Sequence, residues 1–260
     1  MFKVMLSIFM VLWATAAWGA DLDLRQKAEA GDVKAQYDLA YTLLMGDGAA
    51  VDYPAAMAWA VKAAMQGNTN AHGLIGYMYY VGLGVSQDYD RAFHNYLLAL
   101  NGGEDPDMLM RLAYCYLRGH GVQKNYVMAV ELMERAAAAN DAYAMFILGM
   151  LYYEGREVPM DWERAKVWFA KSVSAEHPDG AVVLCRIYLA EGRDEDGLMW
   201  YAVLAGLAPQ RAATLDEAMD AVMPDMTQAE LDNAMTRARA WLDEYARAQK
   251  ASAALTKGME

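Results

Sequence analysis

The sequence predicts an all-α fold, a solenoid of about five helix-turn-helix repeats, and two observations lead to this prediction. The first is a column of glycines, each closing a run rich in Tyr and Leu, separated by 36, 37, 36 and 37 residues: Gly46, Gly82, Gly119, Gly155 and Gly192. The second is that other columns keep the same spacing, among them Ala56, Ala92, Ala129 and Ala165. A fixed period of this length is typical of stacked helical repeats.

Each repeat unit reads as a helix, a tight turn and a second helix. In the second unit, Ile75 and Tyr79 are four residues apart, which places them on one face of the first helix. Gly82 and Gly84 can adopt positive φ at no steric cost, so the helix is expected to end there and the chain to reverse. Asp88 then begins the second helix, where its side chain accepts backbone N–H bonds. The equivalent positions hold Asp52, Asn125 and Asp161.

The repeat array is predicted to span residues 20–207. Its units fall at about 28–67, 68–103, 104–139, 140–176 and 177–207, and residues 22–29 are expected to form a half-helix that covers the first unit. The fifth unit is irregular because its turn, around Gly192, has lost about five residues. Atypical end repeats are expected in such arrays, because a terminal unit receives no further neighbour.

C-terminal capping helices are predicted over residues 208–250. A short helix runs from Pro209 to Val222, and a capping box, Thr227 to Glu230, opens a longer helix through about Lys250. The buried stripe of this longer helix is predicted to be Leu231, Met235, Ala238 and Leu242. Residues 251–260 are expected to form a frayed tail.

These units resemble the Sel-one-like repeat family, which is related to the tetratricopeptide repeat. The resemblance rests on the turn Gly82-x-Gly84-Val85, with Tyr79 before it and Asp88 after it, and it runs from about residue 28 to residue 207. It implies that the helix pairs stack into a right-handed superhelix. It also implies a scaffold or adaptor role, because members of the family commonly act in that way in bacteria, often after export. Some disulfide-rich relatives are associated with β-lactam binding or hydrolysis, but their paired-cysteine spacing is absent here.

The N-terminus has the pattern of a secretory signal peptide over residues 1–19. Lys3 precedes an apolar run that ends in the small-x-small triplet Ala17-Trp18-Gly19, and cleavage is expected after Gly19. An uncleaved membrane anchor is the alternative, although the run is shorter than a bilayer span requires. We therefore expect a periplasmic or secreted protein of a bacterial envelope, with no stable membrane insertion after cleavage.

The charge of the chain disfavours nucleic acid as a partner. The net charge is −12 at pH 7, and removal of Lys3 with the signal peptide makes it −13. Such a surface repels phosphate, and no basic cluster overrides it locally.

The sequence contains no recognisable catalytic or metal-binding constellation. None of its four histidines stands in a metal-ligand spacing, and nucleophile-elbow and phosphate-loop motifs are missing. We predict that the chain is not an enzyme and needs no cofactor. One whole repeat lies between Cys115 and Cys185, so they are predicted to be buried free thiols, with a disulfide as the less favoured alternative.

Candidate partner-binding residues come from two variable columns on the first helices, because the core columns barely change. One column is Asp38, Leu74, Arg111 and Ile147, and the other, seven residues along the same helices, is Met45, Val81, Arg118 and Glu154. Arg111 and Arg118 form the sharpest pair and suggest a carboxylate-bearing partner. The alternative is that they pair with local Asp or Glu. A stripe of tyrosines, which includes Tyr41 and Tyr77, is interpreted mostly as core packing.

The sequence favours an exported, non-catalytic scaffold that binds a protein or peptide in the concave groove of the solenoid. Two alternatives stay open. One is a cell-envelope hydrolase or cell-wall-ligand binder related to β-lactam or peptidoglycan chemistry. The other is a periplasmic regulator of a membrane sensor.

Overall fold

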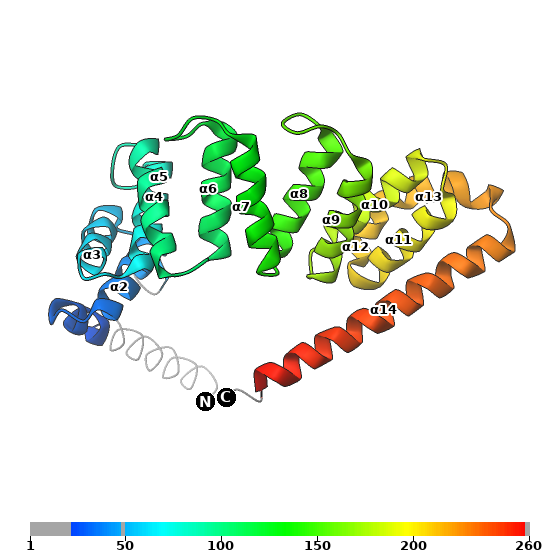
Figure 1. Ribbon diagram of the computed structural model, residues 1–260. Coiled ribbons are helices and arrows are strands. Elements are labelled where there is room, and N and C mark those ends of the chain that lie inside the picture. The colour runs from blue at the N-terminus through cyan, green and yellow to red at the C-terminus, as the bar shows by residue number, and fades with distance from the viewer. Residues whose placement is uncertain (1–21, 48–49, 258–260) are drawn as a thin grey trace, which may run out of the picture. The chain divides into compact units, whose positions relative to one another are not determined.

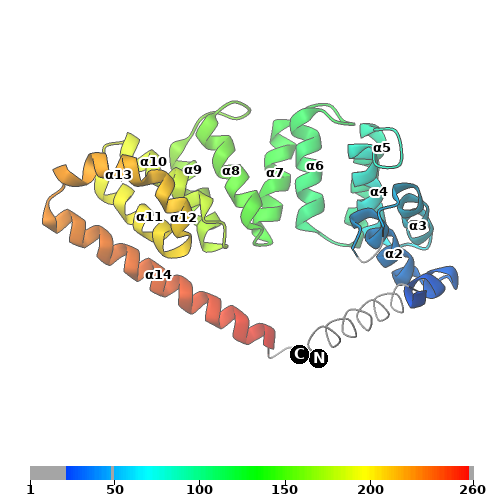
Figure 2. The same ribbon diagram turned by 180° about the vertical axis from the view of Figure 1, so that it is seen from behind.

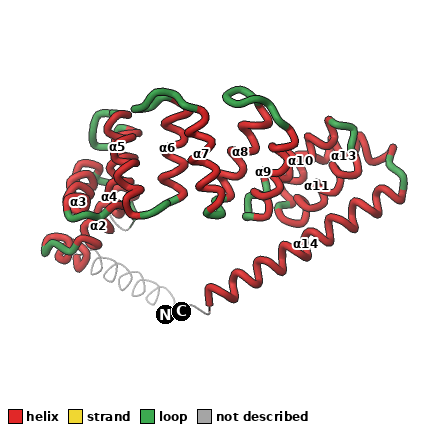
Figure 3. The backbone as a smooth tube through the Cα atoms, viewed as in Figure 1, coloured by secondary structure: helices red, strands yellow, loops and turns green. Residues whose placement is uncertain are grey.

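The computed structural model describes residues 22–47 and 50–257, and every regular element in this part of the chain is a helix (Figure 3). The predicted all-α superhelix of repeated helix pairs is confirmed. The predicted signal peptide lies outside the described residues. The chain divides into two compact units between Leu132 and Met133, here called the N-terminal and the C-terminal unit, and this boundary falls within one helix, α7.

The N-terminal unit consists of consecutive helices that pair as the repeats predict (Figure 1). Residues 22–29 are helical, as expected, and are followed by α2 (Val33–Met45), α3 (Tyr53–Met65), α4 (Thr69–Val81), α5 (Tyr89–Ala99), the short 3-10 helix η1 (Leu100–Gly102), α6 (Pro106–Arg118) and the start of α7 (Tyr126–Ala138). Helix α2 packs on α3, and α4 packs on α5. Each repeat therefore contributes one first helix and one second helix.

The predicted turn chemistry is confirmed at both ends of the turn. The glycines that end the first helices adopt left-handed conformations, with φ of +76° at Gly46, +84° at Gly82, +73° at Gly119 and +65° at Gly155. The acidic column caps the second helices, since Asp88 Oδ1 accepts a hydrogen bond from the backbone N–H of Arg91 at 2.9 Å. Asp52, Asn125 and Asp161 accept the equivalent bonds.

A second column of caps, at the starts of the first helices, was not predicted. Their side chains accept backbone N–H bonds from the first turn of each helix, and the residues are Asp32, Asn68, Asp105 and Asp141. This column has the same 36- and 37-residue spacing as the others. Both helices of each of the first four repeats are thus fixed at their N-termini by short polar side chains, whereas α10 and α11 of the fifth repeat have no side-chain cap.

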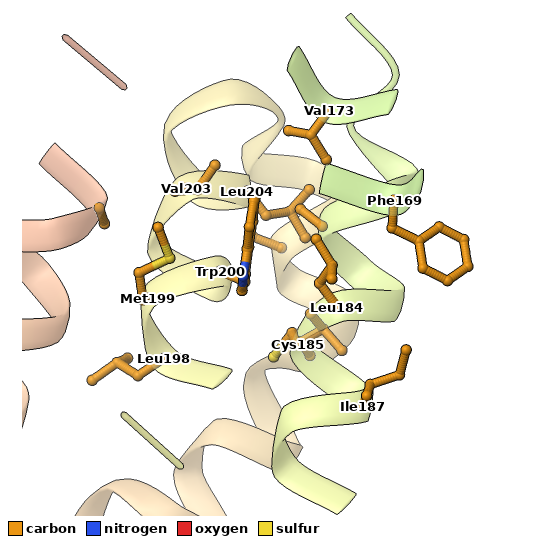
Figure 4. Packing of buried hydrophobic residues seen from close by; sticks show 14 of the residues in the cluster. Phe169, Val173, Leu184, Cys185, Ile187, Leu198, Met199, Trp200, Val203 and Leu204 are labelled. Atoms are coloured by element: carbon orange, nitrogen blue, oxygen red, sulfur yellow. The ribbon is translucent and has the colours of Figure 1, made fainter. Parts of the chain in front are cut away.

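The C-terminal unit continues the helix pairs and then adds the predicted cap. After the end of α7 it contains α8 (Ala142–Glu154), α9 (Trp162–Ser174), α10 (Asp179–Ala190), α11 (Asp194–Leu207), α12 (Pro209–Ala212), η2 (Ala213–Leu215), α13 (Asp216–Val222), η3 (Met223–Asp225) and α14 (Gln228–Lys257). In its core, Trp200 and Leu204 of α11 are directed toward Leu184 and Cys185 of α10 (Figure 4).

The last helix, α14, packs against α11, as Figures 1 and 2 show. The predicted capping box is confirmed, because Thr227 N–H donates to Glu230 Oε2 at 2.7 Å and Glu230 N–H donates to Thr227 Oγ1 at 3.3 Å. Side-chain contacts add to this packing, since Arg237 pairs with Glu195 at 3.1 Å and with Asp196 at 2.7 Å.

Two details of α14 differ from the prediction. Met235 is 41% exposed, whereas Ala234 and Ala238 are buried, so the buried stripe was placed partly on the wrong face. Small residues four apart let α14 lie close to α11, and Met235, one residue further, points about 100° away. The helix also continues to Lys257, beyond the expected end near Lys250, because its sequence has no Gly or Pro and is rich in Ala.

Among the helices of residues 22–47 and 50–257, none combines the length and the apolar character needed to cross a bilayer.

Candidate functional site

A pocket of about 420 Å³ lies in the N-terminal unit, on three successive first helices, α2, α4 and α6 (Figures 1 and 2 show these helices). Its lining comes from all three helices and from the cap of α6: Tyr37, Tyr41 and Met45; Asn70, Gly73, Leu74 and Tyr77; Asp105, Asp107, Met108 and Arg111. The pocket is thus a product of the repeat, because each unit contributes the corresponding face of its first helix.

Helical spacing explains which residues reach the pocket. On α2, Tyr37, Tyr41 and Met45 follow one another every four residues, so they share one face. On α4, Gly73 contributes no side chain, and the position of its absent Cβ is 3.1 Å from Met108 Sδ of α6. A larger residue at this position would extend into the space between the two helices. The glycine therefore keeps the pocket open beside Met108.

The side chain of Arg111 is held by groups of its own unit. Its Nε donates to Asp107 Oδ2 at 2.9 Å, and the guanidinium lies 5.9 Å from the ring centroid of Tyr96, a residue that is 1% exposed. It lies over the ring of Tyr77, 5.2 Å from the centroid. Burial lowers the pKa of Arg111, but Asp107 and Tyr96 raise it by more, so the guanidinium stays charged.

Two carboxylates, those of Asp105 and Asp107, line the pocket at the start of α6. Asp105 caps α6 by accepting the backbone N–H of Asp107 at 2.8 Å, and the side chain of Asp107 is 60% exposed. Burial raises the pKa of Tyr37, and Tyr41, Asp38 and Asp105 raise it further. The carboxylates of Asp38 and Asp105 thus add to the effect of burial in disfavouring ionisation of the Tyr37 hydroxyl.

The structure brings three of the predicted partner-binding residues into the pocket, namely Met45, Leu74 and Arg111. Asp38 is half-buried, pairs with Lys34 at 2.5 Å and lies outside the pocket. Val81 is 45% exposed, outside the pocket.

Arg118 is exposed at the end of α6 and lies outside the pocket. Its charge acts on the turn that follows α6. Burial lowers the pKa of His120 in this turn, and the positive charges of Arg118 and Lys124 lower it further. The alternative, that the arginines pair with local Asp or Glu, holds for Arg111, which pairs with Asp107. That Arg111 and Arg118 together bind a carboxylate-bearing partner stays a prediction.

The remaining two candidates belong to the C-terminal unit. Ile147 is half-buried on α8, and Glu154 is exposed at the end of that helix, where Arg156 lies 3.4 Å away. No contact in that unit distinguishes either residue as part of a site.

Sequence reasoning missed the aromatic and acidic part of the pocket. The tyrosine stripe was interpreted as mostly core, and Tyr41 is an exception, because it is 42% exposed and lines the pocket with Tyr77. The signal was present in the spacing, since Tyr41 and Tyr77 follow the predicted positions Asp38 and Leu74 by three residues and so share their helix face. The core interpretation does hold for Tyr152, which is buried.

Other chemistry is sparse in the described part of the chain. Cys115 and Cys185 are free and buried, as predicted, and burial raises the pKa of each thiol to about 11. Both therefore stay protonated at neutral pH, which makes them poor nucleophiles. Within the same residues, no group of three or more His, Cys, Asp or Glu side chains is arranged to hold a metal ion.

Comparison with known proteins assigns the repeats. The family model described as Sel1 repeat matches residues 33–68, 70–104, 106–141 and 142–177. The human protein sel-1 homolog 2 is 33% identical over 103 residues, which is 39% of this chain and 15% of the relative. An Arabidopsis thaliana protein described as ERAD-associated E3 ubiquitin-protein ligase component HRD3B is 36% identical over 104 residues, or 39% of this chain and 16% of the relative. The match thus spans under a fifth of either relative.

Two solved structures resemble larger parts of the chain. One is c5321, a protective antigen present in uropathogenic Escherichia coli strains and displaying an SLR fold. It has a TM-score of 0.66 and 29% identity, and the match covers 87% of this chain and 48% of that one. The other is a Sel1 repeat protein from Oxalobacter formigenes, with a TM-score of 0.62, 25% identity and coverage of 84% and 89%.

Proposed function

Because the chain belongs to the Sel1 repeat family, we propose that it is a non-catalytic adaptor that binds a protein or peptide partner in the pocket formed by α2, α4 and α6. The observation that carries the proposal is the pocket itself. It exposes aromatic and methionine side chains on three consecutive repeats, and such side chains are frequent anchors at protein interfaces.

The exposure of two α2 residues adds support. Tyr41 is 42% exposed and Met45 is 52% exposed, although both face a hollow rather than a flat surface. An aromatic ring and a flexible thioether that line a hollow together gain contact area when a ligand covers them. The relative HRD3B is described as a component of a ligase, which is a role within an assembly of proteins.

We also propose that the protein is located outside the bacterial cytoplasm. The support is the pattern of residues 1–19, in which Lys3, an apolar run and a small-x-small triplet follow one another as in secretory signals.

Photocrosslinking from position 45 tests the partner site. A photoreactive amino acid at Met45 in the full chain, expressed in the source cells, is expected to give a discrete crosslinked protein in the envelope or secreted fraction. The matched control places the same group at Met65, which is 82% exposed on α3 and lies outside the pocket. Mass spectrometry identifies the adducts from both positions.

Two exposed-residue variants sharpen the comparison. In the Tyr41→Ala background, the adduct from position 45 is expected to fall by roughly tenfold, because removing an aromatic anchor typically costs more than 1 kcal/mol of binding. Val61→Ala, at a residue 40% exposed on α3, is expected to leave the adduct unchanged. Equal adducts from positions 45 and 65 would contradict the proposed site. Recovery of the adduct only from the cytoplasm would contradict the proposed location.

A further inference from the structure

The pocket on α2, α4 and α6 carries more negative than positive charge toward a ligand. Asp105 and Asp107 line it, and Arg111 is the single cation among its lining residues. That cation already has a partner, because Arg111 Nε donates to Asp107 Oδ2 at 2.9 Å and its guanidinium lies over the rings of Tyr77 and Tyr96. An incoming carboxylate would therefore meet the carboxylate of Asp107 beside this guanidinium. The exposed side chain of Asp107, by contrast, has further acceptor capacity, since a carboxylate accepts several bonds.

The aromatic lining favours the same sign of ligand charge. The face of a tyrosine ring attracts a cation, and the pocket already shows this contact, since Arg111 lies 5.2 Å from the Tyr77 ring centroid. Tyr37 and Tyr41 add two more rings on α2. Tyr41 is 42% exposed, so its ring remains accessible to a ligand.

We propose that the pocket binds a basic side chain, lysine or arginine, from a peptide segment of the partner. This inference rests on the proposed function and names the chemistry of the partner. The methylene stem would lie against Met45 and Leu74, and the charged end would meet Asp107 and the ring of Tyr41. The net charge of −12 at pH 7 favours the approach of a basic partner over an acidic one.

Methionine methyl NMR on the full chain provides a direct test, because Met45 and Met108 both line the pocket. The protein is labelled with ¹³C at the methionine methyl groups, and these two signals are assigned through Met45→Leu and Met108→Leu. Three blocked tripeptides are titrated, with lysine, norleucine or glutamate between two alanines. The lysine peptide is expected to saturate both shifts at a roughly fivefold lower concentration than the norleucine peptide, through its charge-assisted and cation–π contacts. The glutamate peptide is expected to bind most weakly.

Asp107→Asn tests the charge at the site itself. This change keeps the backbone N–H that Asp105 caps, at 2.8 Å, so α6 retains its N-cap. Affinity for the lysine peptide is expected to fall roughly threefold or more, as for loss of an exposed ion pair, while affinity for the norleucine peptide stays constant. Asp90→Asn is the matched control, because Asp90 is also an exposed aspartate in a first turn, that of α5, and lies outside the pocket.

Three results would overturn the inference: glutamate binding as tightly as lysine, Asp107→Asn behaving like Asp90→Asn, or no shift at Met45 and Met108 with any peptide. If the glutamate or norleucine peptide bound as tightly as the lysine peptide, and this binding were lost in Tyr41→Ala, the charge preference alone would be refuted and the proposed function would stand. The crosslinks from position 45 decide the proposed function separately, since they make no assumption about ligand charge.

Discussion

Phe169→Ala is expected to lower the free energy of unfolding of the C-terminal unit by about 3–5 kcal/mol, the usual cost of removing a fully buried aromatic side chain. Phe169 of α9 is 0% exposed, and its ring points away from Leu184 and Cys185 in Figure 4. It lies instead against α8, with its centroid 5.7 Å from that of Phe146. The absent Cβ of Gly149 would be 2.6 Å from the Phe169 ring, so the ring fills the space that this glycine leaves. The phenylalanine therefore joins the two helices of the fourth repeat.

Urea denaturation followed by circular dichroism measures this effect. Val167→Ala is the matched control on the same helix, because Val167 is 54% exposed, and it is expected to change the unfolding free energy by no more than about 0.5 kcal/mol. If the two variants unfolded at the same urea concentration, the ring of Phe169 would not be a main contact of the C-terminal core.

Gly121→Ala is expected to destabilise the N-terminal unit by about 3 kcal/mol or more, from backbone strain together with overpacking. Gly121 has φ of +69°, which is strained for alanine. A Cβ at this position would also collide with the carbonyl group of Tyr89, whose carbon would be 2.6 Å away, at the start of α5. A backbone group cannot rotate aside as a flexible side chain does, so the turn and α5 must separate.

Gly67→Ala separates the two causes. Gly67 has φ of +89° in the same unit, but no atom lies within 4 Å of its added Cβ. Only the strain of the left-handed conformation remains, which costs roughly 1–2 kcal/mol. Thermal unfolding of both variants is expected to show the larger loss for Gly121→Ala. Equal losses would mean that the contact between successive repeats contributes nothing beyond the conformation of the turn.

The fold was predictable because its repeated features depend on local chemistry. A glycine that ends a first helix and an aspartate that caps a second helix act within a few residues, so the columns of Gly82 and Asp88 could be interpreted without coordinates. The close approach of Gly121 to Tyr89 could not, because it depends on how one repeat lies against the next.

The candidate site was predictable only in part for a similar reason. The variable columns led to Met45, Leu74 and Arg111, since residues that change between repeats are not needed for the shared core. The pocket, however, also depends on Tyr41, which shares its residue type with the packed tyrosines and differs from them in exposure. The pairing of Arg111 with Asp107 was available from the sequence, because the two residues are four apart on one helix.

The central claim is that the pocket on α2, α4 and α6 is the partner site. It is tested most directly by the structure of the full chain bound to the protein that crosslinks from position 45. We expect a segment of that partner in contact with Tyr41, Met45 and Leu74, with a lysine or arginine near Asp107. A partner seated on α3 and α5 or on α14, with the pocket left empty, would contradict it.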